Sequence, residues 1–166
     1  MTVVALASDH AGVELKKELG SVVAECGFEP LDLGVNDAEK ADYPVIANTL
    51  ASMIAQGRIE RGILICGTGI GISIAANRHR GVRAALCHDV TTSRLARQHN
   101  DANVISIGAR QHTVQEAIRY IDAFIAEPFS GDERHARRIA QLAEYETTGD
   151  IAGKGVDHVA GSANEA

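Results

Sequence analysis

The chain has 166 residues, an ordinary apolar content of 45% and a formal net charge of −6. This length predicts one domain with its own core, and the acidic balance argues against a nucleic-acid-binding protein. Three cysteines without a Cys-x-x-Cys motif favour a reducing compartment over a disulfide framework. Because no apolar run approaches transmembrane length and the N-terminus lacks a basic signal-peptide start, we expect a cytoplasmic protein with no membrane partner.

Short apolar runs alternate with helical patterns along the chain. Strands are expected at 3–7, 30–33, 62–66, 82–87 and 103–107, and helices at about 15–26, 42–56, 70–77, 91–99, 114–125 and 132–146. Thr91 or Thr92 is the expected cap of the fourth helix, and Thr113 with Glu116 forms a capping box before the fifth.

Strict alternation of strands and helices predicts a Rossmann-like fold, a single three-layer α/β/α sandwich around a five-stranded parallel sheet. We assign this domain to residues 1–147. The remaining segment, 148–166, is small and polar, and we expect it to be a flexible C-terminal tail.

The segment that joins the third strand to the third helix is the most informative part of the chain. Its sequence, Cys66-Gly-Thr-Gly-Ile-Gly71, places a thiol and alternating glycines before a helix N-terminus. In a parallel sheet this edge binds ligands, and the loop's N–H groups can hold a phosphate or a developing oxyanion. The same surroundings favour a thiolate, although a lone Cys at a strand end is more often a small buried hydrophobe.

A dinucleotide-binding oxidoreductase is the alternative for this loop. The Gly-x-Gly-x-x-Gly pattern fails because residue 72 is Ile and because the loop follows the third strand, although Asp89 lies near the spacing of the ribose-binding acid. A Walker A loop is excluded because no Gly-Lys-Ser/Thr follows.

Three further groups of polar residues could bind a ligand. Asp9-His10 ends the first strand, where the two residues could form a turn or helix cap or could contact substrate. His99-Asn100 ends a helix, where the pair could stabilise the helix C-terminus or His99 could donate a proton. Arg134 and Arg138 share one face of the last helix, and they could either be solvated side chains or bind a phosphate together. The other histidines lack metal-ligand spacing, so we expect no metal.

Together these segments resemble the family of sugar-phosphate isomerases that contains ribose-5-phosphate isomerase B and the galactose-6-phosphate isomerase subunits. The matching segments occur in family order and cover the chain to about residue 147: Ala7–Gly12, Asp42–Pro44, Gly62–Asn77, Arg97–Asn103, Gly108–Arg110 and Arg134-His135. Their joint occurrence is far more specific than any one of them.

The resemblance implies an aldose–ketose isomerase that needs no metal or cofactor and works through a cis-enediolate. D-ribose 5-phosphate to D-ribulose 5-phosphate is the first expectation; allose 6-phosphate, galactose 6-phosphate or a tetrose phosphate are the alternatives. The resemblance also implies a homodimer, or a tetramer, in which each site is built from two subunits and the last helix reaches the partner.

Residue roles follow from the resemblance by position. The implied catalytic residues are Cys66 as base, His99 as acid, and Thr68 and Asp9 at the sugar hydroxyls. The implied substrate-binding residues are Asp9, His10, Tyr43, Gly67, Thr68, Gly69, Ile70, Gly71, Asn100, Arg110, Arg134 and Arg138, among which His10 and the two helix arginines hold the phosphate. One subgroup of the family has no Cys at position 66 and uses a Glu elsewhere in the chain as the base; the presence of Cys66, with Ala75 in the following helix, indicates the Cys type.

Overall fold

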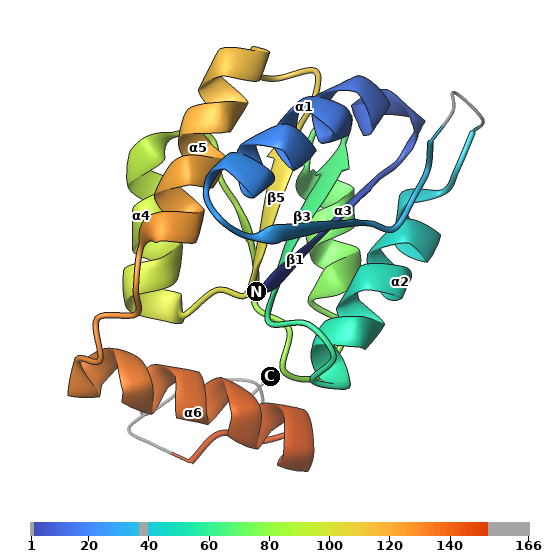
Figure 1. Ribbon diagram of the computed structural model, residues 1–166. Coiled ribbons are helices and arrows are strands. Elements are labelled where there is room, and N and C mark those ends of the chain that lie inside the picture. Colours follow the sequence, from blue (N-terminus) through green and yellow to red (C-terminus); the bar gives the residue numbers. More distant parts are fainter. Residues whose placement is uncertain (1, 37–39, 153–166) are drawn as a thin grey trace, which may run out of the picture.

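A five-stranded parallel sheet organises the protein (Figure 1). The computed structural model describes residues 2–36 and 40–152. Within them the strands are β1 Val3–Ser8, β2 Glu29–Asp32, β3 Arg61–Cys66, β4 Ala84–Leu86 and β5 Val104–Gly108, in the order β2-β1-β3-β5-β4. Each neighbouring pair is parallel, so all of these strands end at the same edge of the sheet.

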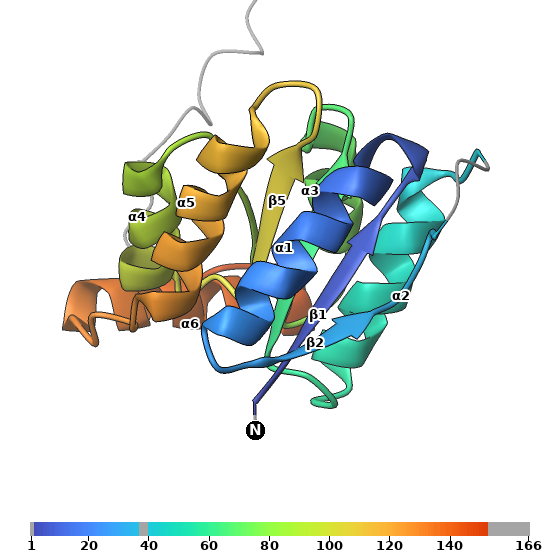
Figure 2. The ribbon, with the colours of Figure 1, turned by 45° about the horizontal axis from the view of Figure 1, so that its top comes forward.

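Helices cover both faces of the sheet (Figures 1 and 2). One layer contains α1 Val13–Glu25, α4 Val90–Asn100 and α5 Val114–Ala126, which pack through a core that includes Leu19, Ile121 and Phe124. The other contains α2 Tyr43–Ala55 and α3 Ile70–Ala76, packed through Leu50 and Ile72. The predicted three-layer sandwich with its five-stranded parallel sheet is therefore confirmed.

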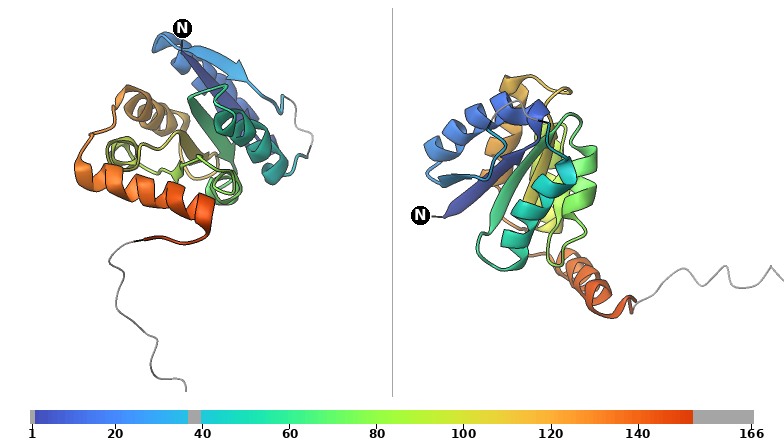
Figure 3. Two further views of the ribbon diagram at one scale, coloured as in Figure 1. Left: turned by 90° about the horizontal axis from the view of Figure 1, so that it is seen from below. Right: turned by 90° about the vertical axis from the view of Figure 1, so that its right-hand side faces the viewer.

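The last helix, α6 Glu133–Thr148, lies outside these layers. It crosses the molecule at the edge where the strands begin, and its main contact is with α4 (Figures 1 and 3). Only His135 of α6 is buried, so most of the helix surface faces solvent in a single chain. No helix of the described residues is both long and apolar enough to cross a membrane.

Two local expectations were wrong. The cap of α4 is Asp89, not Thr91 or Thr92: its carboxylate accepts from Thr92 N at 2.6 Å, and Thr92 stands at the third helical position. The fourth strand is only Ala84–Leu86, shorter than the expected 82–87, because it is an edge strand. The Asn77 side chain occupies its free side, accepting from Ala84 N at 2.8 Å and donating to Ala84 O at 2.9 Å.

The capping box at the start of α5 is confirmed, with Thr113 and Glu116 each bonding the other's backbone N–H. At the other end of the chain, α6 continues to Thr148, and Gln141 Nε2 donates to Ala152 O at 3.3 Å. The remainder of the expected flexible tail, 153–166, lies outside the described residues.

Candidate active site

Cys66 is the last residue of β3, and its thiol lies under the loop that follows the strand. Its side chain is only 4% exposed, and the backbone N–H of Gly69 donates to Sγ at 3.1 Å. An N–H directed at sulfur stabilises negative charge there, which suits a thiol that must act as a base. Burial raises the pKa of the Cys87 thiol to about 11.

Close packing shapes the glycine loop. Gly69 has φ +77°, and a Cβ there would lie 2.6 Å from Leu86 Cδ1 and 2.9 Å from the backbone carbon of Ile107. At Gly71 a Cβ would lie 2.7 Å from Cζ of Tyr43, so the tyrosine ring rests directly on the loop. Only residues without side chains allow the backbone N–H groups to stay this close to their neighbours.

The end of β5 supports the same loop from beneath. Ala109 N donates to Cys66 O at 2.8 Å, and Arg110 N donates to Gly67 O at 3.0 Å. The exposed Thr68 accepts from Ile70 N through Oγ1 at 3.3 Å. The Arg110 guanidinium lies against Gly67, which brings a positive charge to the rim of the loop.

Asp9 lies beside the thiol strand because β1 pairs with β3. Its N–H donates to Ile65 O at 3.1 Å, and its Oδ1 accepts from Ala11 N at 2.9 Å, which caps the short 3-10 helix His10–Gly12. His10 is exposed at the same edge. The β1/β3 boundary is the point where chain connections diverge to opposite sides of the sheet, the usual ligand position in such folds.

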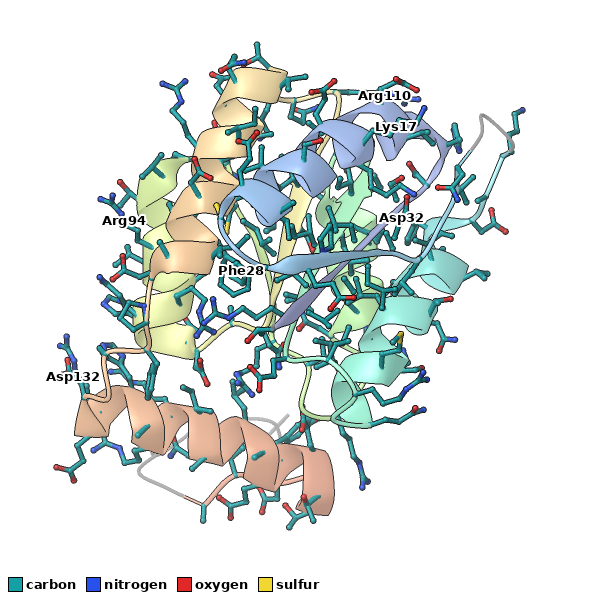
Figure 4. All side chains as sticks on the ribbon, viewed as in Figure 1. Lys17, Phe28, Asp32, Arg94, Arg110 and Asp132 are labelled. Carbon is teal, nitrogen blue, oxygen red and sulfur yellow. The ribbon has the colours of Figure 1, made fainter. Side chains whose placement is uncertain are left out.

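We call this group the thiol half-site: Asp9, His10, Tyr43, residues 66–71 and Arg110. The structure brings all of these predicted residues to the edge where the strands end. Arg110 marks that edge at the top of Figure 4.

The other predicted residues lie elsewhere. Because α4 runs antiparallel to the strands, its last turn, with His99 and Asn100, reaches the edge where the strands begin. Arg83, just before β4, confirms the position: its Nε donates to Asn100 O at 3.0 Å. The exposed Arg134 and Arg138 project from α6 near this turn.

The His99 ring stacks on His135, with centroids 4.2 Å apart and planes 15° from parallel. His135 is 4% exposed; burial lowers its pKa, and the electrostatic effect of the neighbouring His99 and Arg134 lowers it further. His135 is thus the platform on which the His99 ring rests. Sequence reasoning missed this role, although the spacing of His135, Ile139 and Leu142 places them on one helix face.

We call this second group the histidine half-site: His99, Asn100, Arg134, His135 and Arg138. It lies at the opposite edge of the sheet from the thiol half-site, near Asp132 at the lower left of Figure 4. A cavity of about 650 Å³ between α6 and segment 77–85 has Asn100 in its lining but no residue of the thiol half-site. One chain therefore does not bring Cys66 and His99 together.

A parallel α/β sheet with a thiol and backbone N–H groups at its ligand edge is typical of enzymes that act on small molecules. The sequence profile of the family described as ribose/galactose isomerase matches residues 4–142. The chain is 45% identical to ribose-5-phosphate isomerase B of Mycolicibacterium paratuberculosis, over 86% of this chain and 91% of that protein. It is 40% identical to the Escherichia coli K12 protein of the same name, over 88% and 97%.

Solved structures agree with these sequence relations. The type B ribose 5-phosphate isomerase of Trypanosoma cruzi is 44% identical, with a TM-score of 0.87 over 90% of this chain and all of that one. The Mycoplasma genitalium ribose-5-phosphate isomerase B, solved with bound ribulose-5-phosphate, is 40% identical, with a TM-score of 0.84 over 89% and 97%. The chain belongs to the ribose/galactose isomerase family, as its motifs predicted.

The dinucleotide alternative finds no support in the geometry. Asp89, the one acid near the required spacing, uses its carboxylate to cap α4. The glycine loop lies against Tyr43 and the end of β5.

The packing of Gly69 yields a first prediction, with Gly81 as a matched control. Both glycines have positive φ, +77° and +74°, so Ala strains the backbone at either position by about 1–2 kcal/mol. Only at Gly69 does the new Cβ also meet backbone atoms, because the space around Gly81 is open. We expect Gly69→Ala to abolish isomerase turnover and Gly81→Ala to keep it, as measured by urea unfolding and steady-state assays. Wild-type turnover in Gly69→Ala would contradict this account of the loop.

Proposed function

We propose that this chain interconverts D-ribose 5-phosphate and D-ribulose 5-phosphate as a homodimer with two shared active sites. The observation that carries the proposal is the Cys66 thiol held under the Gly69 N–H, with Asp9 on the neighbouring strand. Relatives named ribose-5-phosphate isomerase B, 40–45% identical over most of both chains, support the choice of substrate.

The reaction moves one proton between two carbons and one between two oxygens. The Cys66 thiolate removes the proton from the carbon next to the carbonyl, and the electron pair moves onto the carbonyl oxygen to form an enediolate. N–H groups of residues 67–71 stabilise that oxygen, which is the main catalytic demand for such a weak carbon acid. The thiol then returns its proton to the neighbouring carbon.

His99 carries the second proton transfer. As an acid it protonates the former carbonyl oxygen, and as a base it accepts the proton of the neighbouring hydroxyl, so that the reaction leaves it unchanged. Asp9 and Thr68 lie where they can bind sugar hydroxyls and assist ring opening. His10, Arg134 and Arg138 bind the phosphate, with Asn100 and Arg110 supporting them, and this remote charge positions the reacting carbons.

The separation of the two half-sites supports the proposed dimer. Exposed apolar side chains lie at both of them: Ile70 within the thiol half-site with Val45 and Ile74 beside it, and Leu142 and Tyr145 on α6. In a two-fold dimer, α6 of one chain covers the glycine loop of the other, and the reverse contact occurs at the same time. Both apolar surfaces become buried, and two complete sites form; a tetramer would contain two such dimers.

We further propose that the enzyme needs no metal or cofactor and works in the cytoplasm. A thiol base must stay reduced to act, and a reducing compartment provides that condition.

A substrate panel tests the proposed function. We expect the highest kcat/KM with ribose 5-phosphate, compared with allose 6-phosphate, galactose 6-phosphate and erythrulose 4-phosphate. A better hexose or tetrose phosphate would overturn the substrate but not the class of reaction. Inactivity on all four, together with nicotinamide binding in a fluorescence titration, would favour the oxidoreductase alternative.

The base is tested by Cys66→Ala with Cys87→Ala as its control. Removal of the thiol from the thiol half-site should lower kcat by about 10²–10⁴-fold, the usual contribution of a general base. Substrate binding, measured by calorimetry, should change little, because the phosphate and hydroxyl contacts remain. Cys87→Ala also deletes a buried thiol but should keep wild-type turnover; near-normal turnover in Cys66→Ala would overturn the role of the base.

Mixed dimers test the shared site directly. Cys66→Ala and His99→Ala homodimers should both be nearly inactive. After unfolding and refolding together in equal amounts, half of the dimers are mixed, and each mixed dimer has one intact site. The mixture should therefore recover about a quarter of wild-type activity. Failure to recover activity, with mixed dimers shown by native mass spectrometry, would mean that the site is not shared.

A further inference from the structure

Asp101 follows His99 and Asn100 directly and closes α4. Its backbone has φ 42° and ψ 44°, and it is the only non-glycine residue with positive φ in the described ranges. Its N–H donates to the carbonyls of Ala96 and Arg97, which ends the helix at this point. The left-handed conformation is costly for most residues, so something must hold this turn in place.

Two arginines hold the turn. Asp101 Oδ1 lies 2.8 Å from Arg97 Nη1, and Oδ2 lies 3.2 Å from Arg83 Nη2. Arg83 also donates to the last carbonyls of the helix, from Nε to Asn100 O at 3.0 Å and from Nη2 to Asp101 O at 2.8 Å. We call Arg83, Arg97 and Asp101 the Asp101 cluster.

Arg97 anchors the cluster in the interior. Its side chain is only 8% exposed, its Nη1 donates to Ala102 O at 2.7 Å, and its guanidinium lies over the Phe124 ring, 5.8 Å from the centroid. Without the Asp101 carboxylate, this nearly buried cation and Arg83 would face each other with no anion between them. The Arg97 guanidinium is nearly buried while the Asp101 side chain is 37% exposed, so loss of the carboxylate leaves mainly the Arg97 charge uncompensated, and we expect the turn to shift.

The same turn is tied to the segment that leads into α6. Arg97 Nε donates to Glu127 O at 3.3 Å, Gln98 Nε2 donates to Glu127 Oε1 at 2.7 Å, and Ser130 N donates to Gln98 O at 3.1 Å. The turn therefore fixes where α6 begins relative to α4. His99, stacked on His135, lies at that junction.

We propose that Asp101 is a positioning residue for the isomerisation. It holds His99, and through segment 127–130 also Arg134 and Arg138, in the arrangement that serves the thiol half-site of the partner subunit. This inference rests on the proposed shared site. Asp101 itself does not touch the substrate; it acts through the geometry of the histidine half-site.

Two variants separate this role from backbone strain. Asp101→Gly removes the carboxylate while the backbone adopts positive φ freely, and Asp101→Asn keeps an oxygen and also tolerates positive φ but loses the charge. We expect Asp101→Gly to lower kcat about 10- to 100-fold, the scale of a displacement of about 1 Å in a catalytic group, and Asp101→Asn to lie in between.

Lys17→Ala is the matched control, because it deletes an exposed ion pair on α1, far from this turn (Lys17 is labelled in Figure 4); Lys17 Nζ lies 2.9 Å from Glu14 Oε1. It should keep wild-type kcat. Wild-type kcat in Asp101→Gly, with the variant folded and dimeric, would overturn the proposal.

Mixed dimers then locate the defect. Asp101→Gly refolded with Cys66→Ala should recover about a quarter of wild-type activity, because one site joins an intact Cys66 to an undisturbed His99. Asp101→Gly refolded with His99→Ala should recover almost none, because both variants damage the same half-site. Recovery with His99→Ala instead, or with neither, would overturn the proposal by showing a defect in the thiol half-site or in the whole chain.

If Asp101→Gly does not refold, Asp101→Asn takes its place in both mixtures. We then expect the same order of recovered activities, higher with Cys66→Ala than with His99→Ala, but a smaller difference between them. The mixture of Cys66→Ala and His99→Ala serves as the reference. If this reference mixture recovers activity, the shared site is supported independently of the role of Asp101. If it does not, both proposals are overturned together.

Discussion

The direction of the chain in a parallel sheet is the constraint on which the rest of this structure depends. Every strand ends at one edge, and every connecting helix returns to the other. Cys66 closes a strand and His99 closes a helix, so the two are placed apart by the topology itself. No adjustment of side chains within one chain could join them, and this separation, together with the exposed α6, is what the proposed assembly answers.

The two half-sites use different kinds of electrostatics. The thiol half-site depends on backbone N–H groups fixed by the β3–β5 pairing and by the contact of Gly69 with the end of β5. Such rigid dipoles suit a charge that develops only during the reaction, because they need no reorganisation. The histidine half-site instead offers long, exposed arginines, which suit a phosphate that carries its full charge throughout.

Much of the fold could be predicted from the sequence, because the apolar strands around Ile63 and Ile105 and the helical stripes of the other elements are strongly periodic. The thiol loop could be predicted as well, since Cys66 and its glycines follow a buried strand. The cap of α4 could not, because Asp89 and both threonines after it are acceptable caps, and only the backbone geometry chooses Asp89. The short β4 is bounded by a side-chain contact from Asn77, and the stack of His99 on His135 joins residues far apart in sequence; periodicity reports neither.

The separation of the half-sites has a consequence for the protein in the cell. On the proposed assembly, a newly made chain folds its sheet and shelters its thiol but cannot turn over substrate until it meets a second copy. At low expression the activity would then rise with the square of the amount of protein, and at high expression in proportion to it. A chain whose α6 is lost would leave one dead site in a dimer with a normal chain. Its own thiol half-site would still be completed by the α6 of that normal chain, so a damaged copy would not lower the activity of an intact one.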